Sequence, residues 1–132
     1  MKLWLTNLCL LTLGVASLSA ADWRSFRGDG TSISQDAAPP TKFSADNGVA
    51  WKAKLPGKGV SSPIVVKDRV IITSSSGAKE DRLHTLCFAA ADGKLLWERQ
   101  AWATGRTLCH QSSAVAANTA ASDGSRVFAF YS

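Results

Sequence analysis

Residues 83–97, LHTLCFAAADGKLLW, decide the fold of this chain. An apolar run leads into a tight-turn sequence, Asp92, Gly93 and Lys94, and a second apolar run ends at Trp97. Gly93 can adopt the positive φ that a tight hairpin needs, and the Asp92 side chain can hydrogen-bond the backbone amides of the turn. Trp97 offers a large flat surface to a neighbouring sheet. The stretch therefore predicts two antiparallel strands joined by a hairpin.

Short runs of β-branched and aromatic residues alternate with turn residues over the rest of the chain. Apolar residues nowhere keep a helical period for three turns, so the sequence predicts an all-β fold of antiparallel strands. The predicted strands are Val49–Leu55, Ser62–Val66, Arg69–Ser74, Leu83–Phe88, Leu95–Gln100 and Val127–Tyr131.

The predicted strands differ in how apolar their two faces are. Residues 69–73 and 83–88 carry apolar groups on both faces, which indicates strands that are covered on both sides. Residues 95–100 collect charge towards their end, which is typical of an edge strand protected from pairing with other chains. This combination favours stacked, radially arranged sheets over a sandwich.

An internal repeat supports the radial arrangement. Trp51 and Trp97 lie 46 residues apart, close to the roughly 40 to 45 residues of a four-stranded propeller blade. The Arg-Val pair at Arg69 recurs at Arg126, 57 residues later. The second copy therefore carries about 11 extra residues, around Thr104 to Ser113.

The repeat resembles those of the pyrroloquinoline quinone (PQQ)-like β-propeller family. The resemblance rests on residues 83–97, with their acidic-Gly-Lys turn and terminal Trp, and on Ser61–Pro63 together with Asp68–Val70, which match the start of a blade. Residues 22–30, DWRSFRGDG, also resemble the mature N-terminus of secreted members.

The resemblance implies a β-propeller of four-stranded antiparallel blades, incomplete in this chain, over residues 49–132. Val49–Leu55 would be the outermost strand that closes the ring, residues 62–99 blade one, and Val127–Tyr131 the second strand of blade two. Because a ring needs at least four blades, we expect a longer protein of which these residues are the beginning. The structural blade motif comprises Asp92, Gly93, Lys94, Trp97 and Trp51.

Residues 1–21 have the pattern of a signal peptide. A positive start at Lys2 precedes an apolar run from Leu3 to Leu18, and small residues allow cleavage after Ala21. The rival interpretation, a retained membrane anchor, is weaker because about 16 apolar residues fall short of the roughly 20 that span a bilayer. We expect an exported protein, periplasmic or extracellular, with no membrane span after cleavage and an extended lead-in over residues 22–48.

The charge pattern does not favour nucleic acid as a partner. The formal net charge is +5, but the basic residues are scattered along the chain and form no basic run. Nucleic-acid binding normally shows a basic patch or a motif. We interpret the charge as a solvated surface.

Four residues, His84, Cys87, Cys109 and His110, have the composition of a structural zinc site. His84 and Cys87 are three apart on a predicted strand, however, and would point to opposite faces, so we expect no metal site. One alternative for the cysteines is a Cys87–Cys109 disulfide, because an exported protein meets an oxidising compartment. The other is a buried, unpaired Cys87.

No catalytic pattern stands out. The sequence has no Gly-x-Ser-x-Gly motif and no Gly-rich loop joining a strand to a helix. The leading hypothesis is a non-catalytic secreted or periplasmic propeller without a cofactor, a scaffold that binds a protein or cell-envelope partner. The alternative implied by the resemblance is a PQQ-dependent alcohol or sugar dehydrogenase that holds PQQ and calcium through residues beyond this stretch.

Overall fold

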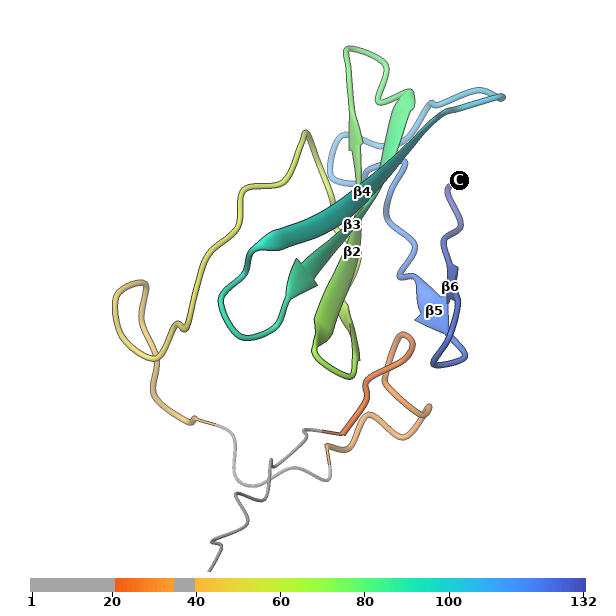
Figure 1. Ribbon diagram of the computed structural model, residues 1–132. Coiled ribbons are helices and arrows are strands. Elements are labelled where there is room, and N and C mark those ends of the chain that lie inside the picture. Colours follow the sequence, from red (N-terminus) through yellow and green to blue (C-terminus); the bar gives the residue numbers. More distant parts are fainter. Residues whose placement is uncertain (1–20, 35–39) are drawn as a thin grey trace, which may run out of the picture.

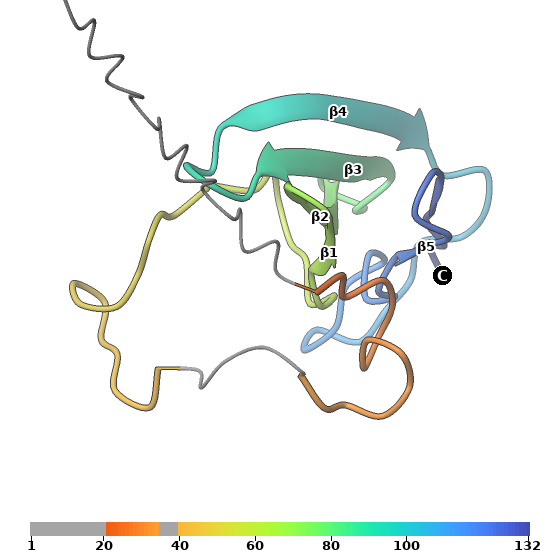
Figure 2. The same cartoon turned by 60° about the horizontal axis from the view of Figure 1, so that its bottom comes forward.

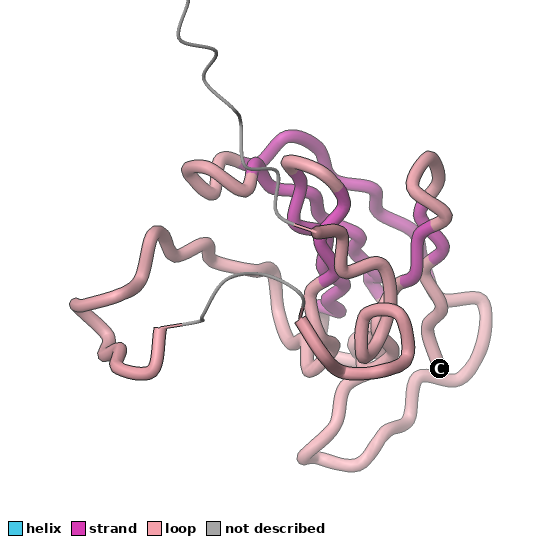
Figure 3. Tube along the Cα trace, turned by 90° about the horizontal axis from the view of Figure 1, so that it is seen from below, coloured by secondary structure: helices cyan, strands magenta, loops and turns pink. Residues whose placement is uncertain are grey.

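The computed structural model describes residues 21–34 and 40–132, so the predicted signal peptide lies outside the described residues except for Ala21. Within these ranges the chain is all-β, as predicted, and Figure 3 shows strands and loops only. No helix in the described ranges is long and apolar enough to cross a membrane.

A four-stranded antiparallel sheet dominates the structure (Figure 1). Consecutive strands pair with one another in the order β1-β2-β3-β4, and Figure 2 shows them following one another from β1 to β4. A second sheet contains two short antiparallel strands, β5 and β6. The strands are β1 (Ile64–Val66), β2 (Arg69–Ser76), β3 (Arg82–Ala89), β4 (Leu95–Trp102), β5 (Ala121–Ser122) and β6 (Val127–Phe128).

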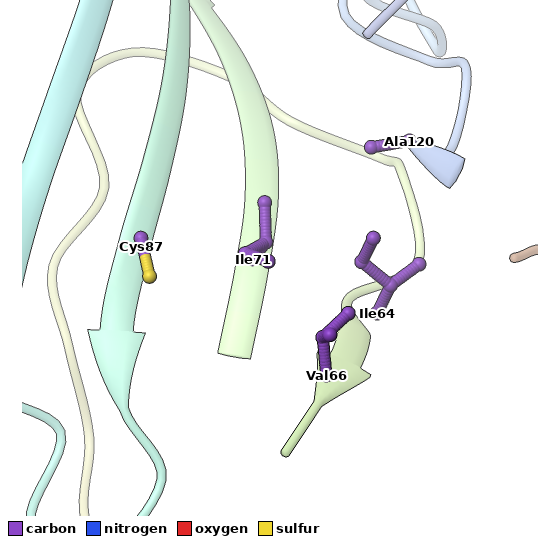
Figure 4. Close-up of a cluster of buried hydrophobic side chains, with 5 residues drawn as sticks. All are labelled: Ile64, Val66, Ile71, Cys87 and Ala120. Carbon is purple, nitrogen blue, oxygen red and sulfur yellow. The ribbon is translucent and has the colours of Figure 1, made fainter. Parts of the chain in front are cut away.

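One face of the large sheet carries the hydrophobic core. The strand registers align Ile64, Ile71, Cys87 and Trp97 in one row across β1 to β4. Ile64 and Cys87 are completely buried and Ile71 is nearly so. Ala120, just before β5, joins this cluster (Figure 4), against which Trp97 and Val127 are packed. The core therefore lies between the large sheet and the chain around β5 and β6.

The predicted strand Val49–Leu55 is wrong. A strand needs a hydrogen-bonded neighbour, and none of the described strands pairs with residues 49–55. These residues therefore form no β-strand. The side chains nevertheless alternate as in a strand: Trp51 and Leu55 are half-buried, whereas Lys52 is exposed. The period of two in the sequence thus reports packing against the sheet, not backbone pairing.

The residues before β1 connect the two sheets. Trp23 forms an antiparallel bridge with Val65 of β1, with N–H···O distances of 2.8 and 2.9 Å. The carbonyl of Arg24 accepts a hydrogen bond from the backbone N–H of Ser122 in β5 (2.8 Å). The orange segment in Figure 2 accordingly runs beside β1. Backbone hydrogen bonds therefore join the start of the lead-in to both sheets.

Strand β4 is the exposed outer strand of the sheet. Seven of its eight residues are exposed, and among the described strands it pairs only with β3. Arg82 lies over the ring of Trp102, with 5.4 Å from the guanidinium carbon to the ring centroid. Arg99 lies 6.0 Å from the centroid of Trp97. Arg99 lies on the edge strand itself, as the sequence predicted, and Arg82 reaches Trp102 of that strand from β3.

The turn between β3 and β4 gives a test of this packing. Gly93 has a φ of +71°, and an added Cβ would lie 2.5 Å from the ring of Trp51. We expect Gly93→Ala to lower the free energy of unfolding by about 3 kcal/mol, because backbone strain and overpacking add. Urea denaturation of the protein measures this loss.

Two glycines serve as controls for this substitution. Gly30 has a φ of +97° with nothing within 4 Å of an added Cβ, so Gly30→Ala reports backbone strain alone. Gly105 has open space and no positive φ, so Gly105→Ala should change stability little. If Gly93→Ala costs no more than Gly30→Ala, Trp51 does not pack on the turn.

Candidate functional site

The predicted turn motif adopts a regular hairpin geometry. The backbone N–H of Gly93 donates to the carbonyl of Ala89 (2.9 Å), and Asp92 Oδ1 accepts from the backbone N–H of Lys94 (3.0 Å). Lys94 itself is exposed. The turn thus uses Asp92 and Gly93 for backbone geometry.

The two tryptophans of the motif pack in different places. Trp51 packs on Gly93, lies 6.3 Å from Phe88 between ring centroids, and donates its indole N–H to the carbonyl of Ala90 (2.8 Å). Trp97 instead packs on the core face that contains Cys87. The structure therefore brings Trp51 to the turn and places Trp97 against the core.

Both cysteines in the described part of the chain, Cys87 and Cys109, are free. Cys87 lies in the core, where burial raises the pKa of its thiol. Cys109 is exposed on the chain that follows β4. The structure therefore contains no Cys87–Cys109 disulfide, because β3 points Cys87 into the core. His84 hydrogen-bonds β2 and β4 residues away from that core, and the described residues contain no group of three metal-ligating side chains.

A polar network that the sequence analysis missed crosses β2, β3 and β4. His84 is buried, and its Nε2 lies 2.7 Å from Ser76 Oγ while its Nδ1 lies 2.6 Å from Glu98 Oε1. Beside it, Ser74 Oγ is buried without a hydrogen-bond partner in the described part of the chain. The polar runs Thr73–Ser76 in β2 and Glu98–Gln100 in β4 were the available signal, but only the strand registers place the three side chains together.

The order serine, histidine, carboxylate is that of acyl-transfer enzymes. Catalysis also needs a place for the substrate beside the serine. None of these three side chains lines the three best-formed grooves among the described residues. The network does link three strands, and buried polar networks of this kind fix strand register when their members are satisfied.

The largest of these grooves lies at the end of the sheet where β2 turns into β3. It has a volume of about 620 Å³. One wall is the β2–β3 turn, and the other is the long loop between β4 and β5, residues 103–120 (Figure 1). We call this loop the excursion; it is the region in which the sequence carries its extra residues. We call the groove itself the basic groove; it is lined by Lys58, Ala78, Lys79, Glu80 and the excursion residues Gly105, Arg106, Thr107, Leu108, Cys109, His110 and Gln111.

Glu80 supports the basic groove from within. Its Oε2 accepts hydrogen bonds from Ser75 Oγ (2.9 Å) and from the backbone N–H of Val115 (3.1 Å), and its Oε1 lies 3.3 Å from Lys58 Nζ. Burial alone would raise the pKa of Glu80, but these donors outweigh it and lower the pKa below its usual value. Glu80 therefore stays ionised at neutral pH and ties the β2–β3 turn to the chain before β5.

Comparison with known proteins gives one match. A family model of PQQ-type repeats, described as outer membrane protein assembly factor BamB, matches residues 24–132. The match covers the whole of both sheets and the basic groove. Searches of curated proteins and of solved structures each found no match.

The contacts of Glu80 predict a dependence of stability on pH. Because its pKa in the folded protein is lower than the usual 4.5, its contribution is complete above that pH and is lost as the pH falls through the folded-state value. We expect Glu80→Gln to cost roughly 1 kcal/mol at neutral pH. The difference from the unchanged protein should shrink below pH 4.5.

Urea denaturation at several pH values measures this difference. Asp68→Asn is the matched control, because the Asp68 side chain is 83% exposed and its ion pair with Arg69 is long, at 3.7 Å. The control should change stability little at any pH. A constant difference between Glu80→Gln and the unchanged protein down to acid pH contradicts the assignment.

Proposed function

Because this chain belongs to the PQQ-type repeat family whose model is described as outer membrane protein assembly factor BamB, we propose that it is a non-catalytic β-propeller protein that acts outside the cytoplasm as a binding or assembly scaffold. The observation that carries the proposal is the match itself, which extends over residues 24–132. The partner on this proposal is a protein or another component of the cell envelope.

The propeller arrangement is supported by how the large sheet is covered. Its four strands follow one another in sequence order, as in a blade. One face packs on Ala120 and Val127, and Phe88 on the other face contacts Trp51. On this proposal the large sheet is one blade, β5 and β6 belong to the next, and residues 49–55 lie where a neighbouring blade would be.

The scaffold role is supported by the structural part that the residues of the blade motif play. Asp92 and Gly93 form the β3–β4 turn, and Trp97 packs against the core. All of these contacts serve packing or backbone geometry. Repeat proteins of this kind offer loops at the ends of their strands as binding surfaces, and the basic groove is such a surface.

The alternative function is a PQQ-dependent dehydrogenase with PQQ and calcium. Calcium needs six to eight oxygen ligands, several of them carboxylates. The described residues contain no cluster of carboxylates suited to this, and Asp22, Glu80 and Asp123 each accept hydrogen bonds from their own neighbours. The described residues do not fit such a site.

Export is part of the proposal. The predicted cleavage after Ala21 would make Asp22 the first residue of the mature protein. Asp22 Oδ1 accepts a hydrogen bond from the backbone N–H of Lys67 (2.6 Å), and its Oδ2 pairs with Arg24. The mature chain would thus begin at a residue that is already held against the β1–β2 turn.

N-terminal sequencing of the expressed protein tests export. We expect the sequence to begin at Asp22 and the protein to be recovered from outside the cytoplasm, because residues 1–21 carry the features that signal peptidase recognises. Recovery of a soluble cytoplasmic protein with an intact Met1 would refute this part of the proposal.

A cofactor assay separates the two functions. We expect no saturable dye-linked oxidation of alcohols or sugars when PQQ and calcium are added to the protein. A PQQ-dependent dehydrogenase of known activity, assayed in parallel, shows that the reagents work. Saturable activity that requires both PQQ and calcium would contradict the scaffold function and support the dehydrogenase.

A further inference from the structure

We propose that the basic groove binds a short, extended, acidic segment of a partner protein. This inference deepens the proposed scaffold function and rests on it, since a scaffold requires a partner.

The charge of the groove favours an anionic ligand. Its lining includes three basic side chains, Lys58, Lys79 and Arg106, and one carboxylate, Glu80. The Glu80 carboxylate already accepts hydrogen bonds from Val115 N–H and Ser75 Oγ and forms an ion pair with Lys58. Lys79 and Arg106 are exposed and make no ion pair within the described part of the chain. Two cationic groups on opposite walls are thus left for a ligand.

The walls are fixed by hydrogen bonds that backbone N–H groups donate. The outer wall is tied down at both ends, by the N–H of Ala103 to the carbonyl of Asp81 (2.9 Å) and by the N–H of Val115 to Glu80. The floor is held where Lys58 exchanges two backbone hydrogen bonds with Ser75, at 2.8 and 2.7 Å. A preformed groove needs less ordering when a ligand binds, which favours affinity.

The outer wall is the segment that distinguishes the second repeat from the first. The 11 or so extra residues around Thr104 to Ser113 are absent from the first copy, and insertions within repeats often form a binding face. Leu108 on this wall is 77% exposed. A segment that pairs acidic side chains with an apolar one would contact Leu108 together with Lys79 and Arg106.

A peptide fits this site better than a bilayer surface does. The cationic residues flank a concave groove, whereas a membrane surface attracts basic segments spread over an exposed face. The volume of the groove lies within the range of about 300 to 1,000 Å³ typical of sites for small ligands. A few residues of an extended chain therefore suffice to occupy it.

Peptide titration of the whole protein tests the proposal. The probe is a short synthetic peptide of glutamate, aspartate and leucine, with a lysine-containing peptide of equal length as the negative control. We expect binding of the acidic peptide that weakens as salt is added. The double substitution Lys79→Glu and Arg106→Glu should weaken binding at least tenfold.

The matched control carries the same change of charge elsewhere. Lys52→Glu with Lys54→Glu alters two exposed lysines outside the groove and should change affinity less than twofold. Thermal unfolding checks that both double variants are folded, and Lys79→Ala with Arg106→Ala is the milder substitution if the first pair is not. Equal loss in the groove pair and the control pair would overturn the proposal.

Alkylation of Cys109 locates the bound peptide. This exposed thiol lines the groove, so the acidic peptide should slow its reaction with a maleimide, while buried Cys87 serves as the unreactive reference. Unchanged alkylation, or protection by anionic phospholipid vesicles without protection by the peptide, would overturn the proposal. If the peptide does not bind, the groove proposal fails but the proposed scaffold function does not. PQQ-dependent oxidation would instead contradict the scaffold function, whether or not the peptide binds.

Discussion

The burial of one face of the large sheet is the constraint on which the rest of the structure depends. Ile64, Ile71, Cys87 and Trp97 form a row across all four strands, and water would contact this row if nothing covered it. A few strands alone are marginally stable until a hydrophobic face is packed. Ala120 and the β5–β6 hairpin supply that cover. The chain must therefore return from the exposed edge at β4 to the opposite side of the core.

That return path creates the basic groove. The chain leaves the edge at Trp102 and crosses the end of the sheet before it reaches Ala120. On the way it is fastened to earlier parts of the chain: the carbonyl of Asn118 accepts from Thr73 Oγ1 (3.2 Å), and Thr119 Oγ1 accepts from the backbone N–H of Ser62 (3.0 Å). The excursion therefore stands against the β2–β3 turn as a second wall. A candidate binding surface arises as a consequence of core packing.

The two ends of the sheet have different chemistry. Towards the β3–β4 turn, Phe88 and Trp51 make apolar contacts, whereas towards the basic groove Ser76, His84 and Glu98 form a polar network. A shift of register by one residue would break this network and move every side chain to the wrong face. The polar end thus contributes specificity to strand pairing, and the apolar end contributes burial.

The sequence by itself determined the features that depend on neighbouring residues. The alternation of apolar residues and the Asp92-Gly93 turn placed β2, β3 and β4 close to their observed bounds, because hairpin geometry is local. It could not show that residues 49–55 lack a paired strand, that Cys87 and Cys109 remain apart, or that His84 meets Ser76 and Glu98. Only the tertiary structure decided these points and the groove, because contacts such as Glu80 with Val115 and Trp51 with Ala90 join residues 35 and 39 positions apart.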